Sequence, residues 1–266
     1  MTSIAYKLVP AALLAAMLLP AQQPAGAAAP AQAGAQPAAA RPAPEPEVKR
    51  WRAGVKFSGQ FLNLFDEMSL KTFDSIPWKH TSSATTDISN RLGFGLSFAA
   101  GVTSRVSLNI DAIYRRAGFR SGLEITEGRD DPGTIADDRN ITSGFEQTKA
   151  DYWDLPFTLR MHDGPPSRRV RGFVEIGGAL RHATSIRTYA ELETPGKPGT
   201  VDATPARPAN SNVLGAVAGA GWDWRTAKGV NVVPQVRYTY WMKPVFDTVR
   251  TRSSRSQIEF MLGFTF

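Results

Sequence analysis

The feature that most constrains this chain is a two-residue alternation of apolar and polar side chains, clearest at its end. Along Gln257–Phe266 one face carries only apolar side chains, and the other carries mostly polar or small ones. A period of two is typical of a β-strand whose two faces meet different surroundings. The last ten residues are therefore predicted to form a strand.

The same alternation recurs in seven further segments, each about as long as a tilted strand needs to cross a bilayer. These segments are Trp51–Phe61, Arg91–Ala100, Val106–Arg116, Asp151–Met161, Val170–Arg181, Leu214–Trp224 and Val232–Met242. After position 50 no apolar stretch reaches the length of a transmembrane helix. The sequence therefore predicts an all-β fold with eight strands.

The lengths of the connections distinguish a membrane barrel from a soluble sandwich, which would also alternate. Connections after the second, fourth and sixth strands are short, whereas those after the first, third and fifth are long; the seventh is intermediate. The long ones span residues 62–90, 117–150 and 182–213. Short turns at one end and long loops at the other are typical of outer-membrane barrels.

The placement of charge gives the orientation of the strand faces. On the apolar faces charge occurs only at strand ends, at Arg116 and Asp151, while the opposite faces carry both signs. Because ionised groups away from water need partners, we expect a paired network inside the barrel. Its expected members are Arg52, Lys56, Asp111, Asp154, Arg160, Glu175, Arg237 and Glu259. The predicted fold is an eight-stranded antiparallel up-and-down transmembrane β-barrel.

The segment before the first strand has the composition of an exported leader and a spacer. Lys7, a short apolar run and Ala25-Gly26-Ala27 predict a signal peptide over residues 1–27. Residues 28–49 are rich in alanine and proline, which predicts an extended linker. The barrel is expected over residues 50–266.

With these features, residues 50–266 resemble the small eight-stranded outer-membrane barrels, the OmpA/OmpX-like group. Gln257–Phe266 is similar to the signal that the barrel-assembly machinery reads, which implies a role in assembly for Phe264 and Phe266. Asp151–Arg160 is similar to that family's aromatic-acid-apolar-proline strand, and Val170–Leu180 to the glycine-rich strand after it. The resemblance implies the outer membrane as location, with its lipid, lipopolysaccharide and the assembly machinery as partners.

Composition and motifs argue against several other functions. The chain has no cysteine, three scattered histidines and a net charge of +7 without a basic block, so we expect no metal, cofactor or nucleic-acid partner. A lipid A-modifying enzyme is the alternative that His182 with Ser185, or His80 with Ser82, leaves open. The acidic stretch Glu124–Asp138, with aspartates at 130, 131, 137 and 138, is expected to be a solvated loop rather than a calcium site.

Arginines near the external rim could bind phosphates of lipopolysaccharide through their guanidinium forks. They are Arg115, Arg116, Arg120, Arg181, Arg187, Arg250 and Arg252. Because eight strands leave an interior just wide enough for side chains, an open pore is disfavoured and a narrow channel is a second alternative. The leading hypothesis is a non-enzymatic outer-membrane protein whose loops serve adhesion or envelope integrity; the oligomeric state stays open.

Overall fold

A computed structural model describes residues 51–73, 79–128, 139–194, 197–202, 206–248 and 251–266. These residues belong to one unit, Glu45–Phe266. The expected signal peptide and linker lie outside the described residues, as do Asp130, Asp131, Asp137, Asp138 and Arg250. Within the described ranges no helix is long and apolar enough to cross a membrane.

The described residues form thirteen β-strands. They are β1 (Trp51–Gln60), β2 (Phe65–Asp66), β3 (Met68–Phe73), β4 (Lys79–Asp87), β5 (Leu92–Gly101), β6 (Val106–Glu127), β7 (Asn140–His162), β8 (Val170–Thr194), β9 (Lys197–Asp202), β10 (Asn212–Arg225), β11 (Asn231–Trp241), β12 (Arg252–Ser253) and β13 (Ser256–Thr265).

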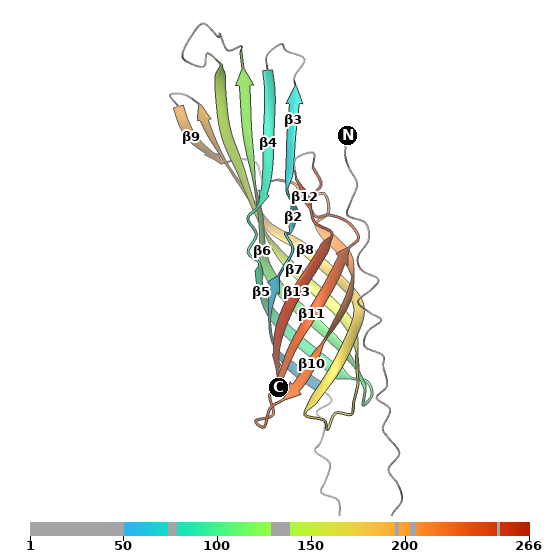
Figure 1. The fold of residues 1–266 in the computed structure, drawn as a ribbon. Helices are drawn as coiled ribbons and strands as arrows, with labels where there is room; N and C mark the ends of the chain where they lie inside the picture. Colours follow the sequence, from blue (N-terminus) through green and yellow to red (C-terminus); the bar gives the residue numbers. More distant parts are fainter. Residues whose placement is uncertain (1–50, 74–78, 129–138, 195–196, 203–205, 249–250) are drawn as a thin grey trace, which may run out of the picture. The chain divides into compact units, whose positions relative to one another are not determined.

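Eight of these strands close into a ring. Neighbours pair in the order β6, β5, β1, β13, β11, β10, β8 and β7, and β7 pairs back to β6. Every pairing is antiparallel, and the first strand closes against the last through Val55 opposite Phe264. Figure 1 shows the tilted strands of this ring. The predicted eight-stranded up-and-down barrel is confirmed.

The wall of this barrel has an apolar outside and a polar inside. In β13 exposed or half-buried apolar residues alternate with buried Gln257, Glu259 and Thr265. Phe57, Leu96 and Ile176 expose 53%, 67% and 66% of their surface on other strands. Soluble proteins rarely expose so much contiguous apolar surface, whereas a transmembrane barrel presents it to lipid. The chain is a transmembrane β-barrel.

At one end of the barrel the connections are tight, and this is called the short-turn end. It comprises residues 102–105, 163–169 and 226–230. In the last of these turns the Thr226 amide donates to the Val230 carbonyl at 2.8 Å, and Gly229 adopts a φ of 82°. Glycine suits that left-handed conformation because it has no Cβ to clash.

At the other end the structure differs from the sequence prediction, because the long connections contain strands. β6, β7 and β8 are 22, 23 and 25 residues long and continue beyond the barrel. β4 pairs with the upper part of β6, β3 with β4, and β9 with β8. Backbone pairing satisfies their polar groups. β4 consists almost wholly of polar residues, so its sequence carries no apolar alternation. This six-stranded sheet, ordered β3-β4-β6-β7-β8-β9, is called the extension (Figure 1).

Candidate functional site in the barrel interior and the extension

The middle of the barrel holds a chain of charged side chains from five strands. Asp111 of β6 accepts from Lys56 Nζ and Arg237 Nη2, each at 2.7 Å. Glu175 of β8 accepts from Arg237 Nε and Arg160 Nη2, each at 2.9 Å. All five side chains are at most 5% exposed. Arg237 therefore bridges two carboxylates through its Nε and Nη2 atoms.

Glycine makes room for this network on the neighbouring strand. A Cβ at Gly219 would lie 3.0 Å from Glu175 Cγ and 2.9 Å from the Val236 carbonyl oxygen. The small residue opposite Glu175 lets the long carboxylate side chain lie across the interior.

A second group of charges lies nearer the extension. Asp154 accepts from Arg181 Nε at 2.7 Å and from Arg115 Nε at 3.0 Å, and Arg115 also donates to Glu259. Both arginines are buried. The expectation that Arg115 and Arg181 lie at the external rim was therefore wrong. Their strands continue for about ten further residues, so positions 115 and 181 fall inside the barrel rather than at its edge.

A third group lies at the short-turn end. Asp223 Oδ2 accepts from Arg171 Nη2 at 2.6 Å and from Arg52 Nη1 at 2.7 Å. Arg52 was expected in the network. Its partner Asp223, and Arg171, which donates to the same carboxylate, were not included, although both stand on polar strand faces. Counting the three groups, seven cations face five carboxylates in the described interior.

Above the charged groups an apolar plug closes the barrel. Leu64 and Phe65 of the plug come from the connection after β1, and Val245 and Phe246 come from the connection after β11. Phe65 packs on Phe246 with ring centroids 6.0 Å apart, and both side chains are about 1% exposed. The plug cannot be predicted from the sequence pattern, because isolated apolar residues in connections carry no periodic signal.

The filled interior bears on the channel alternative. Arg115, Arg181 and Arg237 are among the largest fully buried side chains, and the plug covers them from the side of the extension. Packed ion pairs under an apolar plug do not favour conduction through the described part of the barrel.

Of the remaining rim arginines in the described ranges, three lie on β6 and β8 and one lies on β12, outside the extension. Arg116 and Arg120 are exposed on β6, and Arg187 is exposed on β8. Arg252 lies in β12, with its Nε 3.7 Å from Asp247 Oδ1. Arg116 and Asp151 are cross-strand partners just beyond Tyr114 and Trp153, whose rings pack with centroids 5.3 Å apart.

The candidate nucleophiles lack the contacts of a catalytic triad in the described residues. His182 Nδ1 lies 2.7 Å from Asn212 Oδ1, while Ser185, at a φ of 51°, contacts the Thr184 hydroxyl at 3.2 Å. Ser82 stands opposite Glu124 in the register, yet no hydrogen bond joins them. His80, two residues away on β4, stands opposite Thr126 of β6. The described ranges contain no cluster of three or more residues suited to a metal ion.

The last strand ends beside the first. The Phe266 amide donates to the Ala53 carbonyl at 2.9 Å, and the Phe266 side chain is 57% exposed on the outer face. Phe264 stands on the same face, opposite Val55 and Val232.

Comparisons with known proteins yield similar folds without a family. No family model matches the chain, and no curated protein matches it. Neisserial surface protein A (NspA) is similar with 9% identity and a TM-score of 0.36, covering 82% of this chain and 96% of that one. Ail, the attachment invasion locus protein of Yersinia pestis, crystallised with the heparin analogue sucrose octasulfate, has 10% identity and a TM-score of 0.32, covering 82% and 99%. The fold assignment rests on the strand pairing of this chain itself.

Proposed function

We propose that this protein is a non-enzymatic integral outer-membrane protein that holds a β-sheet outside the cell for adhesive or envelope contacts. One observation carries the proposal: three wall strands continue without a break into a sheet that stands clear of the barrel. The barrel interior is filled with ion pairs and closed by a plug, which supports a role in holding the extension rather than a role as a channel.

The extension has features of a surface that binds other molecules. Its outermost strands β3 and β9 each pair on one side only within the described residues. An unpaired strand edge offers backbone donors and acceptors to an added strand of a partner. We therefore propose contact through these edges as the mode of binding.

Lipopolysaccharide is the proposed partner closer to the membrane. Arg116, Arg120 and Arg187 stand exposed on β6 and β8, and Lys149 is exposed on β7 between them. The register sets Lys149 opposite Arg187 and Gly118. Guanidinium forks just beyond an aromatic belt suit lipid A phosphates.

The experiment removes the two central strands of the extension and keeps the barrel. Arg120 and Gln147 are cross-strand partners, so deleting residues 121–146 and joining the strands by an Asn-Gly turn shortens β6 and β7 together. Membrane fractionation and heat-modifiable gel mobility should show that the shortened barrel still folds in the outer membrane. Cells carrying it should lose adherence to epithelial monolayers, or gain uptake of a hydrophobic dye, relative to cells carrying the full chain.

Two results would contradict the proposal. One is unchanged adherence and dye uptake with the shortened barrel, and the other is a full chain that fractionates with soluble proteins. A matched control keeps the full length of every strand and only reverses the order of the four residues 143–146. Its adherence and dye uptake should equal those of the full chain.

A further inference from the structure

We infer that the short-turn end of the barrel contains a binding site for an oxyanion, a phosphate or carboxylate group. The site is a pocket open to solvent with a cavity volume of about 50 Å³. That space admits a group the size of a few water molecules, which suits a single phosphate or carboxylate group rather than a larger molecule. The inference goes beyond the proposed function, which concerns the opposite end of the molecule.

The charge of the lining selects the sign of the ligand. Four arginines line the pocket, from the wall and from the turns: Arg52, Arg168, Arg171 and Arg225. Asp223 is the one carboxylate among the described residues of the lining, and it already accepts from two of these arginines. Arg168 and Arg225 donate to no side chain in the described ranges, so the pocket carries an excess of positive charge.

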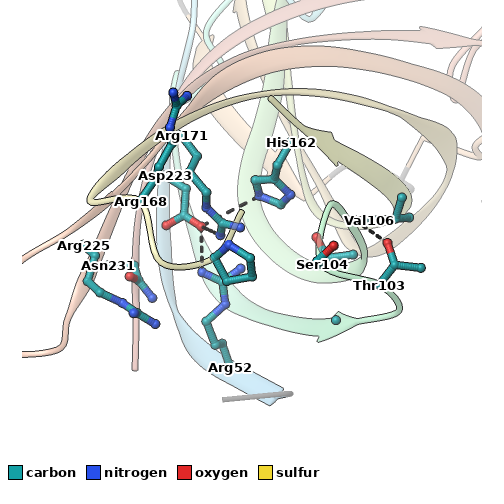
Figure 2. A pocket seen from close by; sticks show the side chains of 13 residues that line it. Arg52, Thr103, Ser104, Val106, His162, Arg168, Arg171, Asp223, Arg225 and Asn231 are labelled. Atoms are coloured by element: carbon teal, nitrogen blue, oxygen red, sulfur yellow. Dashed lines mark hydrogen bonds and ion pairs between the residues drawn. The ribbon is translucent and has the colours of Figure 1, made fainter. Parts of the chain in front are cut away.

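Unsatisfied buried polar atoms lie in the same place. The Nε2 atom of His162, a residue that is 7% exposed, makes no hydrogen bond and lies 3.8 Å from Asp223 Oδ2. Asp223 Oδ1 is also without a partner. A buried polar group without a partner costs free energy. His162 Nε2 can donate to a bound oxyanion, whereas Asp223 Oδ1 accepts and would need a protonated oxygen of a phosphate group. Figure 2 shows His162, Arg171 and Arg52 converging on Asp223.

Neutral donors complete the lining. Ser104 and Asn231 face the pocket from the turn before β6 and from the start of β11. Thr103 Oγ1 accepts from the amides of Arg105 and Val106, which fixes this turn. Guanidinium forks together with hydroxyl and amide groups are the donor set that phosphate and carboxylate groups prefer.

The test observes His162 directly, because the chain has only three histidines. His80 and His182 lie on β4 and β8 toward the extension, so they serve as internal controls. The full chain, labelled on histidine and folded in detergent micelles, is titrated with inorganic phosphate or with acetate at constant ionic strength. We expect a saturable shift of the His162 imidazole signals, with the signals of His80 and His182 unchanged, and no such shift with chloride.

Matched substitutions separate binding from general charge effects. Arg168→Gln and Arg225→Gln each remove a charged donor, which should weaken binding at least about tenfold. Arg169→Gln removes an exposed arginine next to Arg168 that does not line the pocket, and it should leave the affinity unchanged.

The outcomes are decisive in both directions. Saturation by phosphate alone, acetate alone or both supports the site and identifies which source of oxyanion fits it. An equal shift with chloride, the absence of a saturable shift, or an Arg169→Gln effect as large as that of Arg168→Gln would overturn it.

Discussion

The lower and upper halves of β6, β7 and β8 are continuous strands with opposite polarity. In the lower half, Leu108 and Ile110 of β6 point outward and Asp111 points inward. In the upper half, Arg116 and Arg120 point outward, whereas Ala117 and Phe119 point inward into the plug. Along β6 the face that carries the charges is exchanged between Tyr114 and Arg116.

This exchange shows where the solvent outside the wall changes. β7 makes the same exchange between Trp153 and Asp151, which are the cross-strand partners of Tyr114 and Arg116. The Tyr114 hydroxyl donates to Asp151 Oδ1 at 2.7 Å, which joins the aromatic level to the first charged level. Aromatic rings at the interface with charges beyond them are expected where hydrocarbon gives way to headgroups and water. In the lower half of β6 and of β7 the charged side chains are buried and most apolar ones point outward, whereas just above the exchange the apolar side chains are buried and the charged ones point outward.

The largest expected effect is the loss of a carboxylate in the lower half. Glu175→Ala leaves Arg160 and Arg237 without that partner in a buried interior, so it should lower the free energy of unfolding by about 3–5 kcal/mol. Glu191→Ala, on the upper half of the same strand, should change it by less than about 0.5 kcal/mol. Urea unfolding of both variants in lipid vesicles measures the difference. Equal effects would mean that the two halves do not differ in burial.

The next effect sharpens the comparison on the outer face. Ile110→Arg puts a charge into the apolar band of β6 and should cost about 2–4 kcal/mol if the site lies near the middle of the bilayer. Glu124→Arg, on the same face of the same strand but in the extension, should cost less than about 0.5 kcal/mol. If Ile110→Arg left the free energy of unfolding unchanged, this face of β6 would not meet lipid.

A smaller effect on stability is expected at the chain end, where the proposed role is assembly. Deleting Phe266 removes a half-exposed side chain, so refolding in detergent should lose less than the roughly 1.5–3 kcal/mol that full burial is worth. If Phe266 belongs to an assembly signal, the yield of folded protein in cells should fall severalfold. Small and equal losses in cells and in detergent would refute the assembly role.

The smallest effect is expected for an ion pair of the extension. Lys79 Nζ lies 2.5 Å from Glu127 Oε1, and both side chains are partly exposed. Glu127→Gln should therefore lower the free energy of unfolding by less than about 1 kcal/mol, because water screens such pairs. A cost near that of Glu175→Ala would contradict the solvated character of the upper half.

The sequence predicted the barrel because alternation over eight segments reports two environments directly. It did not predict the extension or the plug, since β4 and β9 carry no apolar alternation and Phe65 and Phe246 lie outside periodic segments. The misplacement of Arg115 and Arg181 has a related cause. The level of a residue along a strand depends on where the strand ends, which alternation does not report.

The most direct test of the central claim measures the surroundings of successive outward positions on β6. Because the chain has no cysteine, single cysteines at 108, 110, 112, 114, 116 and 120 can carry a spin label without background. Position 118 is left out because Gly118 is buried beneath Ile88. In lipid vesicles, labels at 108–114 should collide mainly with dissolved oxygen, and labels at 116 and 120 mainly with a water-soluble nickel chelate. The account predicts that this change falls between 114 and 116. High accessibility to the nickel chelate at 108–112 would contradict it.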